Sequence, residues 1–294
     1  MDRLIQSKYG YYSVKDLPTV EELEDFYANK YYQDNTASHL HKYNSEELVF
    51  FENKAKVAEY ILKNLKDKSL LDVGAGEGFF AKYFFDKQWN VTTFDYSDYG
   101  ISTHNPEIKH TIVKNDIFQS IKNSIEESQR YGLINLSNVL EHVIDPVALL
   151  KDLKLLLNER SFLRISVPND FSAFQEFLLN EGDTTTTWVK TPDHLHYFTF
   201  ASLKKLLEAS GYQIYESIGE FPIEIFLSNE VSNYSKKREV GKSAHNARVK
   251  TDNFLFTQGL KEYVDYYKAS ANIGFSRQVV IYAKKTHNQK INNV

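Results

Sequence analysis

A short apolar run followed by three alternating glycines constrains this chain more than any other stretch. Ser69–Val73 reads as a buried strand, and Gly74, Gly76 and Gly78 follow it. Glycine lets a backbone approach a ligand at positions where any Cβ would collide. The pattern therefore predicts a strand, a ligand-binding turn and the start of a helix. A tight turn with a purely structural role is the alternative.

This turn differs from that of a dinucleotide-binding site. Such a site needs a small residue after the third glycine, where this chain has Phe79. Glu77 would repel a pyrophosphate at the positive end of the helix. Asp72, two residues before the first glycine, suits a ligand that carries an amine. An NAD-dependent oxidoreductase is therefore a disfavoured alternative.

Strand-like and helix-like segments alternate along the rest of the chain. Further strands are predicted at residues 91–94, 110–113, 131–136, 162–167, 212–218 and 277–283. This alternation predicts an α/β fold with a doubly wound parallel sheet. In such sheets the ligand binds beyond the carboxyl ends of the strands.

The chain divides into four predicted parts. Residues 1–48 form a tyrosine-rich extension with a capped helix at Pro18–Tyr27. Its tyrosines would either form a lid or simply pack this helix onto the body. Residues 49–219 form the core, including a long polar connection after Pro168. Residues 220–274 form an insert, with helices expected near 223–234 and 251–268, and residues 275–294 supply the final strand and a tail.

Composition excludes several classes of protein. The net charge of −4 argues against nucleic acid as the main partner. Without cysteine there is no disulfide, thiolate metal site or cysteine nucleophile. No apolar run approaches the roughly 20 residues of a membrane span, and the first residues do not resemble a signal peptide. We therefore expect a cytoplasmic protein.

Acidic residues follow three of the predicted strands. Asp95, after the second strand, has two oxygens that can accept both hydroxyls of a ribose. Asp116, after the third, can accept from an adenine amino group while Ile117 packs on the ring. A turn residue and a helix N-cap are the alternatives for these two acids. Ser137 and Asn138 follow the fourth strand, where the reacting group should lie.

These segments resemble the motifs of class I S-adenosylmethionine-dependent methyltransferases. The resemblance rests on Leu71–Gly78, Asp95, Asn115–Asp116 and Asn138–Pro146, and with His194–Thr199 it extends to the type-11 and type-23 families. It implies a Rossmann-like, seven-stranded sheet of order 3-2-1-4-5-7-6 whose last strand is antiparallel. It implies S-adenosylmethionine as the cofactor. The residues that would bind it are Asp72, Gly74, Ala75, Gly76, Gly78, Asp95, Tyr96, Asp116, Ile117, Ser137 and Asn138.

Three histidines are candidate catalytic bases. His142, His194 and His196 carry imidazoles that titrate near neutral pH, although each also suits a structural role. Ubiquinone-pathway O-methyltransferases and small-RNA 2′-O-methyltransferases resemble this region but carry Glu-x-x-Glu-His, which binds a divalent metal. Here the first position is Asn138, so a mixed site of Asn138, Glu141, His142 and His196 is less favoured and the metal stays open.

The resemblance implies an enzyme that methylates a small polar acceptor. By family analogy, we expect a sugar or nucleotide-sugar hydroxyl in surface polysaccharide biosynthesis. Donors in Gly241–Arg248 would suit a phosphate or carboxylate on that acceptor, unless they form only a solvated face. One alternative is a quinone- or polyketide-type O- or C-methyltransferase. The other is a non-catalytic S-adenosylmethionine-binding module that docks a partner. The insert could also form a homodimer.

Overall fold

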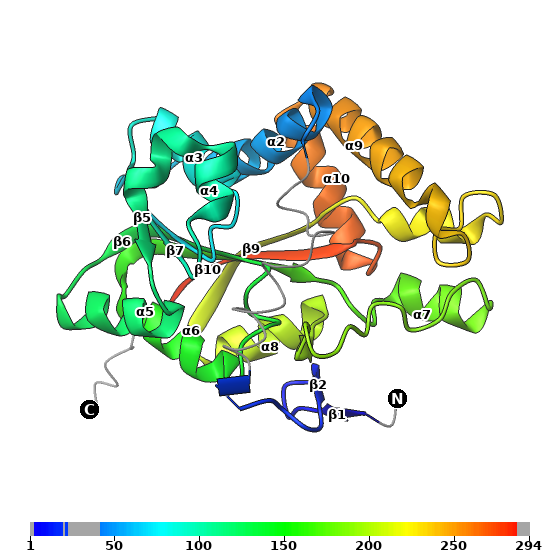
Figure 1. The fold of residues 1–294 in the computed structure, drawn as a ribbon, viewed down its shortest axis with the longest axis horizontal. Coiled ribbons are helices and arrows are strands. Elements are labelled where there is room, and N and C mark those ends of the chain that lie inside the picture. Colours follow the sequence, from blue (N-terminus) through cyan, green and yellow to red (C-terminus); the bar gives the residue numbers. More distant parts are fainter. Residues whose placement is uncertain (1–2, 20, 23–41, 287–294) are drawn as a thin grey trace, which may run out of the picture.

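The chain is built around a seven-stranded sheet that crosses the middle of Figure 1. This computed structural model describes residues 3–19, 21–22 and 42–286. The strand order is β5-β4-β3-β6-β7-β10-β9, and β10 runs antiparallel to both of its neighbours. In chain order the strands are β3 (Ser69–Val73), β4 (Asn90–Asp95), β5 (Ile112–Lys114), β6 (Tyr131–Ser137), β7 (Leu157–Pro168), β9 (Tyr212–Gly219) and β10 (Gln278–Lys285). The predicted order 3-2-1-4-5-7-6 with an antiparallel last strand is confirmed.

Helices cover both faces of this sheet (Figure 1). Because side chains alternate along a strand, Leu70 packs toward α2, α3 and α10, while Leu71 and Val73 pack toward α5, α6 and α8. The helices of these layers are α2 (Ser45–Ile61), α3 (Phe79–Asp86), α5 (Ile117–Glu126), α6 (Pro146–Leu155), α8 (Phe200–Ala209) and α10 (Leu260–Asn272), with the short α4 (Tyr99–His104) beside α3. The predicted α/β fold therefore has one apolar layer on each face of the sheet.

Polar residues fix where two helices of these layers begin. Asp145 accepts a hydrogen bond from Val147 N (3.0 Å) just before Pro146 and α6. Thr199 accepts one from Ser202 N (3.2 Å) at the start of α8. Each bond satisfies a backbone N–H that has no partner within its helix.

A second, three-stranded sheet, which the sequence did not predict, includes two strands that precede the predicted N-terminal helix. It joins β1 (Leu4–Gln6), β2 (Tyr12–Val14) and β8 (His196–Tyr197). Strand β2 pairs with β8 through Ser13 opposite His196. The described N-terminal residues are therefore a hairpin that packs on the loop before α8, below the main sheet in Figure 1.

The predicted N-terminal helix lies mostly outside the described residues. Its capping box is present, because Thr19 N donates to Glu22 Oε2 (2.8 Å) and Glu22 N donates to Thr19 Oγ1 (3.2 Å). The rest of that helix and most of the tyrosine-rich stretch fall within residues 23–41. The lid therefore remains a prediction.

The insert differs from its predicted helices. It contains the 3-10 helices η4 (Ile223–Ser228) and η5 (Arg238–Val240), then α9 (Gly241–Thr257) and α10. The single helix predicted at 251–268 is divided at Gly259, whose φ of 128° no helix accommodates. The polar connection after β7 likewise contains α7 (Ala173–Asn180), which the sequence analysis missed.

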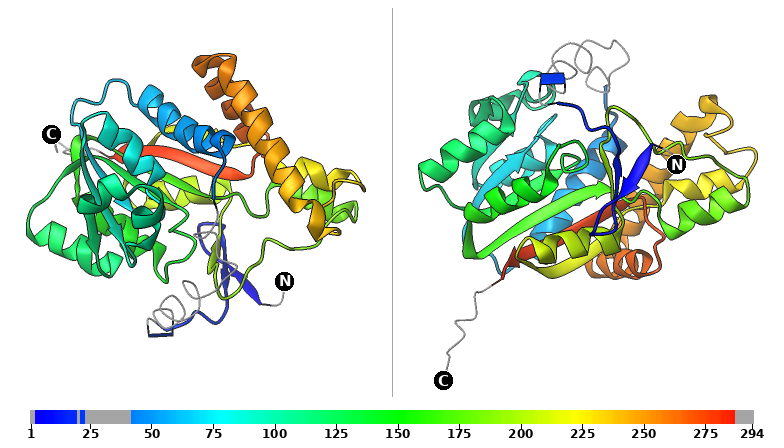
Figure 2. Two further views of the ribbon diagram at one scale, coloured as in Figure 1. Left: turned by 45° about the horizontal axis from the view of Figure 1, so that its top comes forward. Right: turned by 90° about the horizontal axis from the view of Figure 1, so that it is seen from below.

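The insert packs against the core and closes on itself. Helix α9 lies along α2 (Figure 2), where His245 Nε2 lies 2.9 Å from Glu47 Oε1. The two ends of the insert meet at the sheet edge, because Glu220 N donates to Ser276 Oγ (2.8 Å) and Arg277 N donates to Glu220 O (3.3 Å). Among the described residues, no helix is both long enough and apolar enough to cross a membrane.

Candidate functional site

A cavity of about 430 Å³ lies at the carboxyl ends of β3, β4 and β6. Its walls contain ten of the eleven predicted cofactor-binding residues, all except Asp116. The ten are Asp72, Gly74, Ala75, Gly76, Gly78, Asp95, Tyr96, Ile117, Ser137 and Asn138. The predicted edge of the sheet therefore holds a pocket of the size expected for a small ligand.

Gly74 and Gly76 of the turn differ in what a side chain at each position would contact. A Cβ on Gly74 would lie 2.4 Å from Val139 Cγ2, so the turn packs tightly against the segment after β6. A Cβ on Gly76 would meet nothing within 4 Å, because it would project into open space. Both residues have positive φ, 68° and 55°. Gly76 therefore leaves room for a ligand against the backbone.

Asp95 fixes the turn from the end of β4. Its Oδ2 accepts a hydrogen bond from Gly76 N (2.9 Å) and its Oδ1 accepts one from Ser97 N (3.0 Å). A carboxylate offers about four lone-pair sites, which makes Asp95 a suitable acceptor for ligand hydroxyls. Asp95 is buried and lines the cavity.

Asp116 supports the wall from behind. Its Oδ1 caps α5 by accepting from Gln119 N (2.7 Å), and its Oδ2 accepts from the Tyr96 hydroxyl (2.6 Å). The residue that reaches the cavity is thus Tyr96, which Asp116 positions. The cap that the sequence allowed as an alternative is present, and the contact of Asp116 with a bound base stays a prediction.

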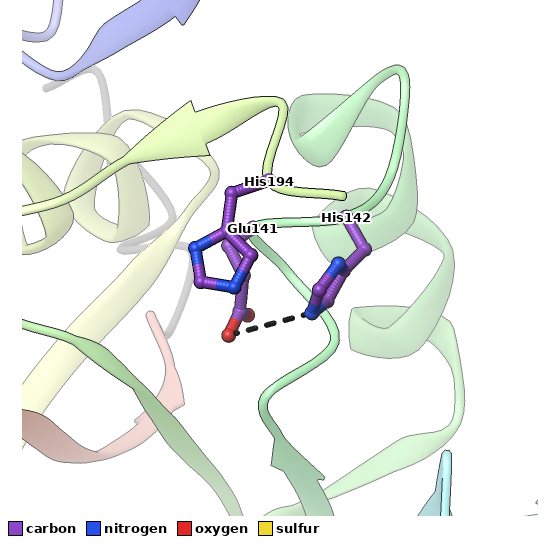
Figure 3. A group of neighbouring side chains, drawn as sticks. All are labelled: Glu141, His142 and His194. Atoms are coloured by element: carbon purple, nitrogen blue, oxygen red, sulfur yellow. Dashed lines mark ion pairs between the residues drawn. The ribbon is translucent and has the colours of Figure 1, made fainter. Parts of the chain in front are cut away.

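Two motifs distant in sequence meet at Glu141. Its backbone carbonyl accepts from Leu195 N (2.8 Å) and from His196 N (3.0 Å). These bonds bring His194 beside His142, with ring centroids 4.9 Å apart and the rings nearly perpendicular (Figure 3). Of the three candidate histidines, only His142 lines the described cavity.

The charges around His142 favour its protonated form. Its Nδ1 donates to the Asp193 carbonyl (2.7 Å), and its Nε2 lies 3.8 Å from Glu141 Oε1. Burial opposes a charge on His142, but the carboxylates of Glu141 and Asp193 outweigh it and raise the His142 pKa to about 9. Burial raises the pKa of Glu141 to about 7, against the opposing effect of His142.

His194 is held in its neutral form. Burial, followed by the charge of His142, lowers the His194 pKa to about 4. Within the described part of the chain, His194 Nδ1 and Glu141 Oε2 are buried without a hydrogen-bond partner. Ligand atoms of Glu141, His142 and His194 all lie within 4.8 Å of one another. Two imidazoles and a carboxylate at this spacing have the donor types of a divalent-metal site.

His196 has a structural role instead of the predicted catalytic one. A carbonyl can only accept, so its Nε2 donates to Val143 O (2.8 Å), and its Nδ1 then accepts from the Ser13 hydroxyl (2.8 Å). Both nitrogens are therefore engaged in holding the N-terminal hairpin to the core. We do not retain His196 as a base or as a metal ligand; His194 takes its place beside Glu141.

The floor of the cavity contains polar residues that the sequence analysis did not select. Asn135 Nδ2 donates to Asp72 Oδ1 (2.6 Å), and Arg164 NH1 donates to Asn135 Oδ1 (2.7 Å). All three line the cavity and are almost completely buried. Burial raises the pKa of Asp72 to about 7, although Asn135 and Arg164 oppose the shift. The sequence did carry a signal for two of these residues: Asn135 and Arg164 are each a polar residue inside an otherwise apolar stretch of strand.

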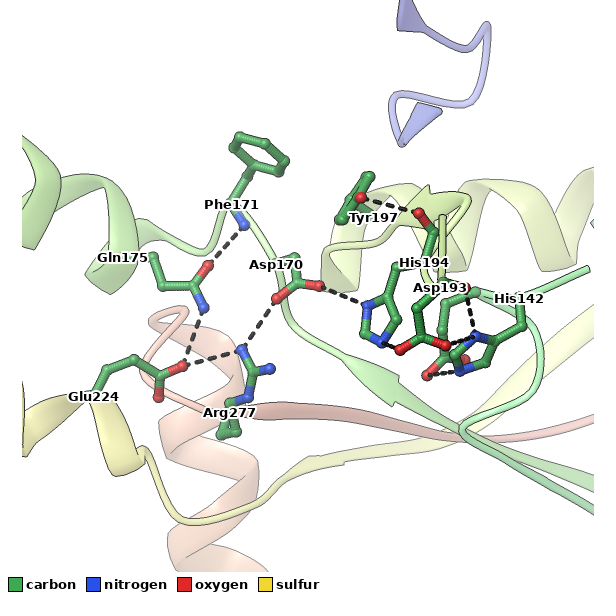
Figure 4. Close-up of polar contacts among 10 residues, drawn as sticks. His142, Asp170, Phe171, Gln175, Asp193, His194, Tyr197, Glu224 and Arg277 are labelled. Carbon is green, nitrogen blue, oxygen red and sulfur yellow. Dashed lines mark hydrogen bonds and ion pairs between the residues drawn. The ribbon is translucent and has the colours of Figure 1, made fainter. Parts of the chain in front are cut away.

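A buried ionic cluster connects the site to the insert (Figure 4). Arg277 NH1 donates to Asp170 Oδ1 (3.0 Å) and to Glu224 Oε1 (3.2 Å). Gln175 Nε2, from α7, also donates to Glu224 (3.0 Å). The other oxygen of Asp170 lies 4.0 Å from His194 Nδ1. The loop after β7, α7, the insert and β10 are therefore held together next to the histidine pair.

Comparisons with known proteins agree with this architecture. Residues 27–217 match a protein family described as a methyltransferase domain. A ubiquinone biosynthesis O-methyltransferase from Rickettsia akari (strain Hartford) is 26% identical over 211 residues, which are 72% of this chain and 78% of that protein.

Two solved structures share the fold. One is a SAM-dependent methyltransferase from Archaeoglobus fulgidus, with a TM-score of 0.51 and 18% identity over 82% of this chain and 95% of that one. The other is the 1,6-didemethyltoxoflavin-N1-methyltransferase of Burkholderia thailandensis, bound to 1,6-didemethyltoxoflavin and S-adenosylhomocysteine. It has a TM-score of 0.50 and 14% identity over 97% of this chain and 100% of that one.

Proposed function

The chain belongs to the methyltransferase domain family, and from this premise we propose that it methylates a hydroxyl group of a small, sugar-derived acceptor. S-adenosylmethionine is the methyl donor. When bound, it supplies an electrophilic methyl group together with its own leaving group. The protein's task is to bind and align the two substrates and to remove a proton from the acceptor.

The described cavity suits this donor. Gly76 leaves open space against the turn, and Asp95 presents carboxylate oxygens beside it. Tyr96 and Ile117 contribute apolar surface to the same wall, while Asp72 lies on the floor. The combination offers an acid for ribose hydroxyls, apolar surface for a base and an acid for an amine. The assignment of these individual contacts is part of the proposal.

His142 is the side chain that we assign to the acceptor. It is the one candidate histidine on the described cavity wall, and this observation carries the proposal. Because its pKa is about 9, the neutral imidazole that can accept a proton is the minor form at pH 7. If His142 acts as the base, kcat should rise with pH until about pH 9.

A divalent cation is the second way to activate the hydroxyl at this site. Glu141, His142 and His194 would hold it, and the unpartnered Glu141 Oε2 and His194 Nδ1 fit that role. The cation would supply Lewis-acid lowering of the hydroxyl pKa. Dialysis against EDTA distinguishes the two arrangements: activity that is lost and then restored by Mg²⁺ or Zn²⁺ supports the cation, whereas unchanged activity supports His142 as the base.

The acceptor would lie on the side of the cavity that faces the insert. Because the Arg277 cluster joins the insert to this side, we propose that residues 220–274 influence acceptor choice. A quinone-type acceptor is the second candidate, favoured by the relative from Rickettsia akari that is named a ubiquinone biosynthesis O-methyltransferase. A homodimer through the insert stays a prediction.

Transfer of a labelled methyl group tests the acceptor directly. The protein would be incubated with methyl-labelled S-adenosylmethionine and either nucleotide sugars, glycans or quinone-precursor catechols. We expect label in the sugar-containing pools. Label in the catechols alone would reject the sugar proposal in favour of the quinone-type alternative. A protein that binds S-adenosylhomocysteine but labels nothing in any pool would support the non-catalytic binding module.

A further inference from the structure

We propose that Arg164 binds the carboxylate of the donor's methionine part, and that Asp72, Asn135 and Arg164 together form a receptor for its zwitterionic amino acid group. This inference rests on S-adenosylmethionine being the donor and deepens the proposed function. It assigns a carboxylate subsite to the floor of the cavity, where the sequence motifs place only the acid Asp72.

The register of the sheet brings the three side chains together. Asp72 lies opposite Asn135 in the β3–β6 pair, and Asn135 lies opposite Arg164 in the β6–β7 pair. Residues opposite each other on neighbouring strands project from the same face of the sheet. The row therefore has an acid at one end, a base at the other and an amide between them, all on the cavity floor.

The central amide fixes the direction of the row. Asn135 donates through Nδ2 to Asp72 and accepts through Oδ1 from Arg164. Reversal of the amide would place donor against donor and acceptor against acceptor, so both bonds define one orientation. An amino acid group has its ammonium and its carboxylate on the same carbon. Bound along this row, it would place the ammonium toward Asp72 and the carboxylate toward Arg164.

The guanidinium of Arg164 has unused donors. The side chain is 3% exposed, and its Nε is buried without a hydrogen-bond partner in the described part of the chain. Among the described residues, no carboxylate lies within 4.0 Å of Arg164; its polar neighbours are the neutral Asn135 amide and the Tyr282 hydroxyl. The Phe80 ring, which also lines the cavity, has its centroid 5.0 Å from Cζ.

The buried guanidinium of Arg164 needs a negatively charged partner. Removing a guanidinium from water is costly unless a carboxylate or phosphate replaces the lost hydration. Asp72 compensates Arg164 only through the intervening amide, and Asp72 itself retains a pKa raised by burial to about 7. The Arg164 end of the row is therefore under-satisfied without a ligand, and at the Asp72 end burial opposes the charged form of the carboxyl. A zwitterion complements both ends at once, which neither a phosphate nor a simple amine does.

Calorimetry with paired ligands tests the subsite without relying on enzyme activity. S-adenosylhomocysteine carries the amino acid group, and 5′-methylthioadenosine is the matching thioether nucleoside without it. Arg164→Met should weaken S-adenosylhomocysteine about 10- to 100-fold, as expected for hydrogen bonds to a charged group. It should change the affinity for 5′-methylthioadenosine less than threefold. Arg160→Met, at an exposed position of the same strand, is the matched control and should change neither affinity.

A second experiment changes the ligand instead of the protein, so its result does not depend on whether a variant folds. Decarboxylated S-adenosylhomocysteine keeps the amine but lacks the carboxylate, and wild-type protein should bind it about 10- to 100-fold more weakly than the parent compound. Equal affinity for both compounds would overturn the inference, as would an equal loss of both nucleosides in Arg164→Met. Wild-type protein that binds none of these nucleosides would overturn the choice of donor and this inference with it.

Discussion

The proposed donor side and the proposed acceptor side of this molecule are built in different ways. The donor side consists of short turns at the ends of β3, β4 and β6, fixed by local hydrogen bonds such as Gly76 N to Asp95. The acceptor side joins segments from four parts of the chain through a buried ion cluster around Arg277. Substitutions on the donor side should therefore alter the affinity for the donor, whereas those on the acceptor side should mainly lower the free energy of unfolding.

The largest expected effect tests that contrast on the acceptor side. Arg277→Met leaves Asp170 and Glu224 buried without their cation, and we expect it to lower the free energy of unfolding by about 3–5 kcal/mol. Denaturant unfolding measures this loss. Lys261→Met, in an exposed pair with Asp265, is the control and should leave the midpoint unchanged. An equally small effect at Arg277 would contradict the stabilising role of the cluster.

The second prediction compares two histidines near the cavity, His142 and His196. His142→Gln removes the imidazole from the cavity wall, and we expect kcat to fall about 10²–10⁴-fold, as for the loss of a general base. The affinity for S-adenosylhomocysteine should stay within about threefold in the same protein, because donor contacts lie elsewhere. His196→Gln should instead lower thermal stability with little change in kcat, because its ring nitrogens hold the hairpin. The reverse pattern would exchange the roles of the two histidines.

A third experiment tests the tight packing of the donor turn. Gly74→Ala places a Cβ 2.4 Å from Val139 Cγ2 at a φ of 68°. We expect a loss of about 2 kcal/mol in stability or in S-adenosylhomocysteine binding. Gly182→Ala has a similar φ of 76° but nothing within 4 Å, so it reports the backbone strain alone. If both substitutions cost the same, the contact with Val139 contributes nothing.

The smallest effect is the pH dependence of donor binding. Burial gives Asp72 a pKa of about 7 in the free protein, so below pH 7 it must lose a proton before it can pair with an ammonium. Affinity for S-adenosylhomocysteine should therefore fall up to about tenfold for each pH unit below 7. Calorimetry between pH 5.5 and 8 measures the slope. Asp72→Asn should abolish it, and an unchanged slope would assign the proton to another group.

The same pKa has the opposite consequence for the ligand-free fold. The folded protein holds the Asp72 proton more tightly than the unfolded chain, whose pKa is the ordinary 3.8. This carboxyl therefore contributes stability that is fully present below about pH 4 and is lost as the pH rises through about 7. Donor binding and fold stability should respond to pH in opposite directions at this residue.

The sequence predicted most of the residues that line the cavity, because these residues lie within a few positions of each strand end; their contacts with the donor stay a prediction. The strand order, the glycine turn and ten cavity-lining residues followed from local patterns and from the family resemblance. Arg164 and Asn135 were missed because their meeting depends on the register between strands, which a local pattern does not give. Inside an apolar run, neither residue shows which face it occupies.

The acceptor side was predicted less well because long-range pairing decides it. His194 and His196 are indistinguishable as a His-x-His pattern, and the pairing of Ser13 with His196 removes the second from the site. That pairing belongs to a hairpin which the sequence analysis did not predict. In the insert, the break at Gly259 separates two helices that apolar spacing alone had merged.

The closure of the insert at Glu220 and Ser276 makes it a candidate for exchange as a unit. Since its ends already meet by hydrogen bonds at the sheet edge, replacing what lies between them adds little loop-closure entropy and leaves the register of β9 and β10 unchanged. If the insert influences acceptor choice as proposed, its exchange would change the acceptor without altering the donor pocket. A transplanted insert would need to bring Glu224 and the sheet-facing side of α10 with it, because Arg277 and the sheet stay behind with the core.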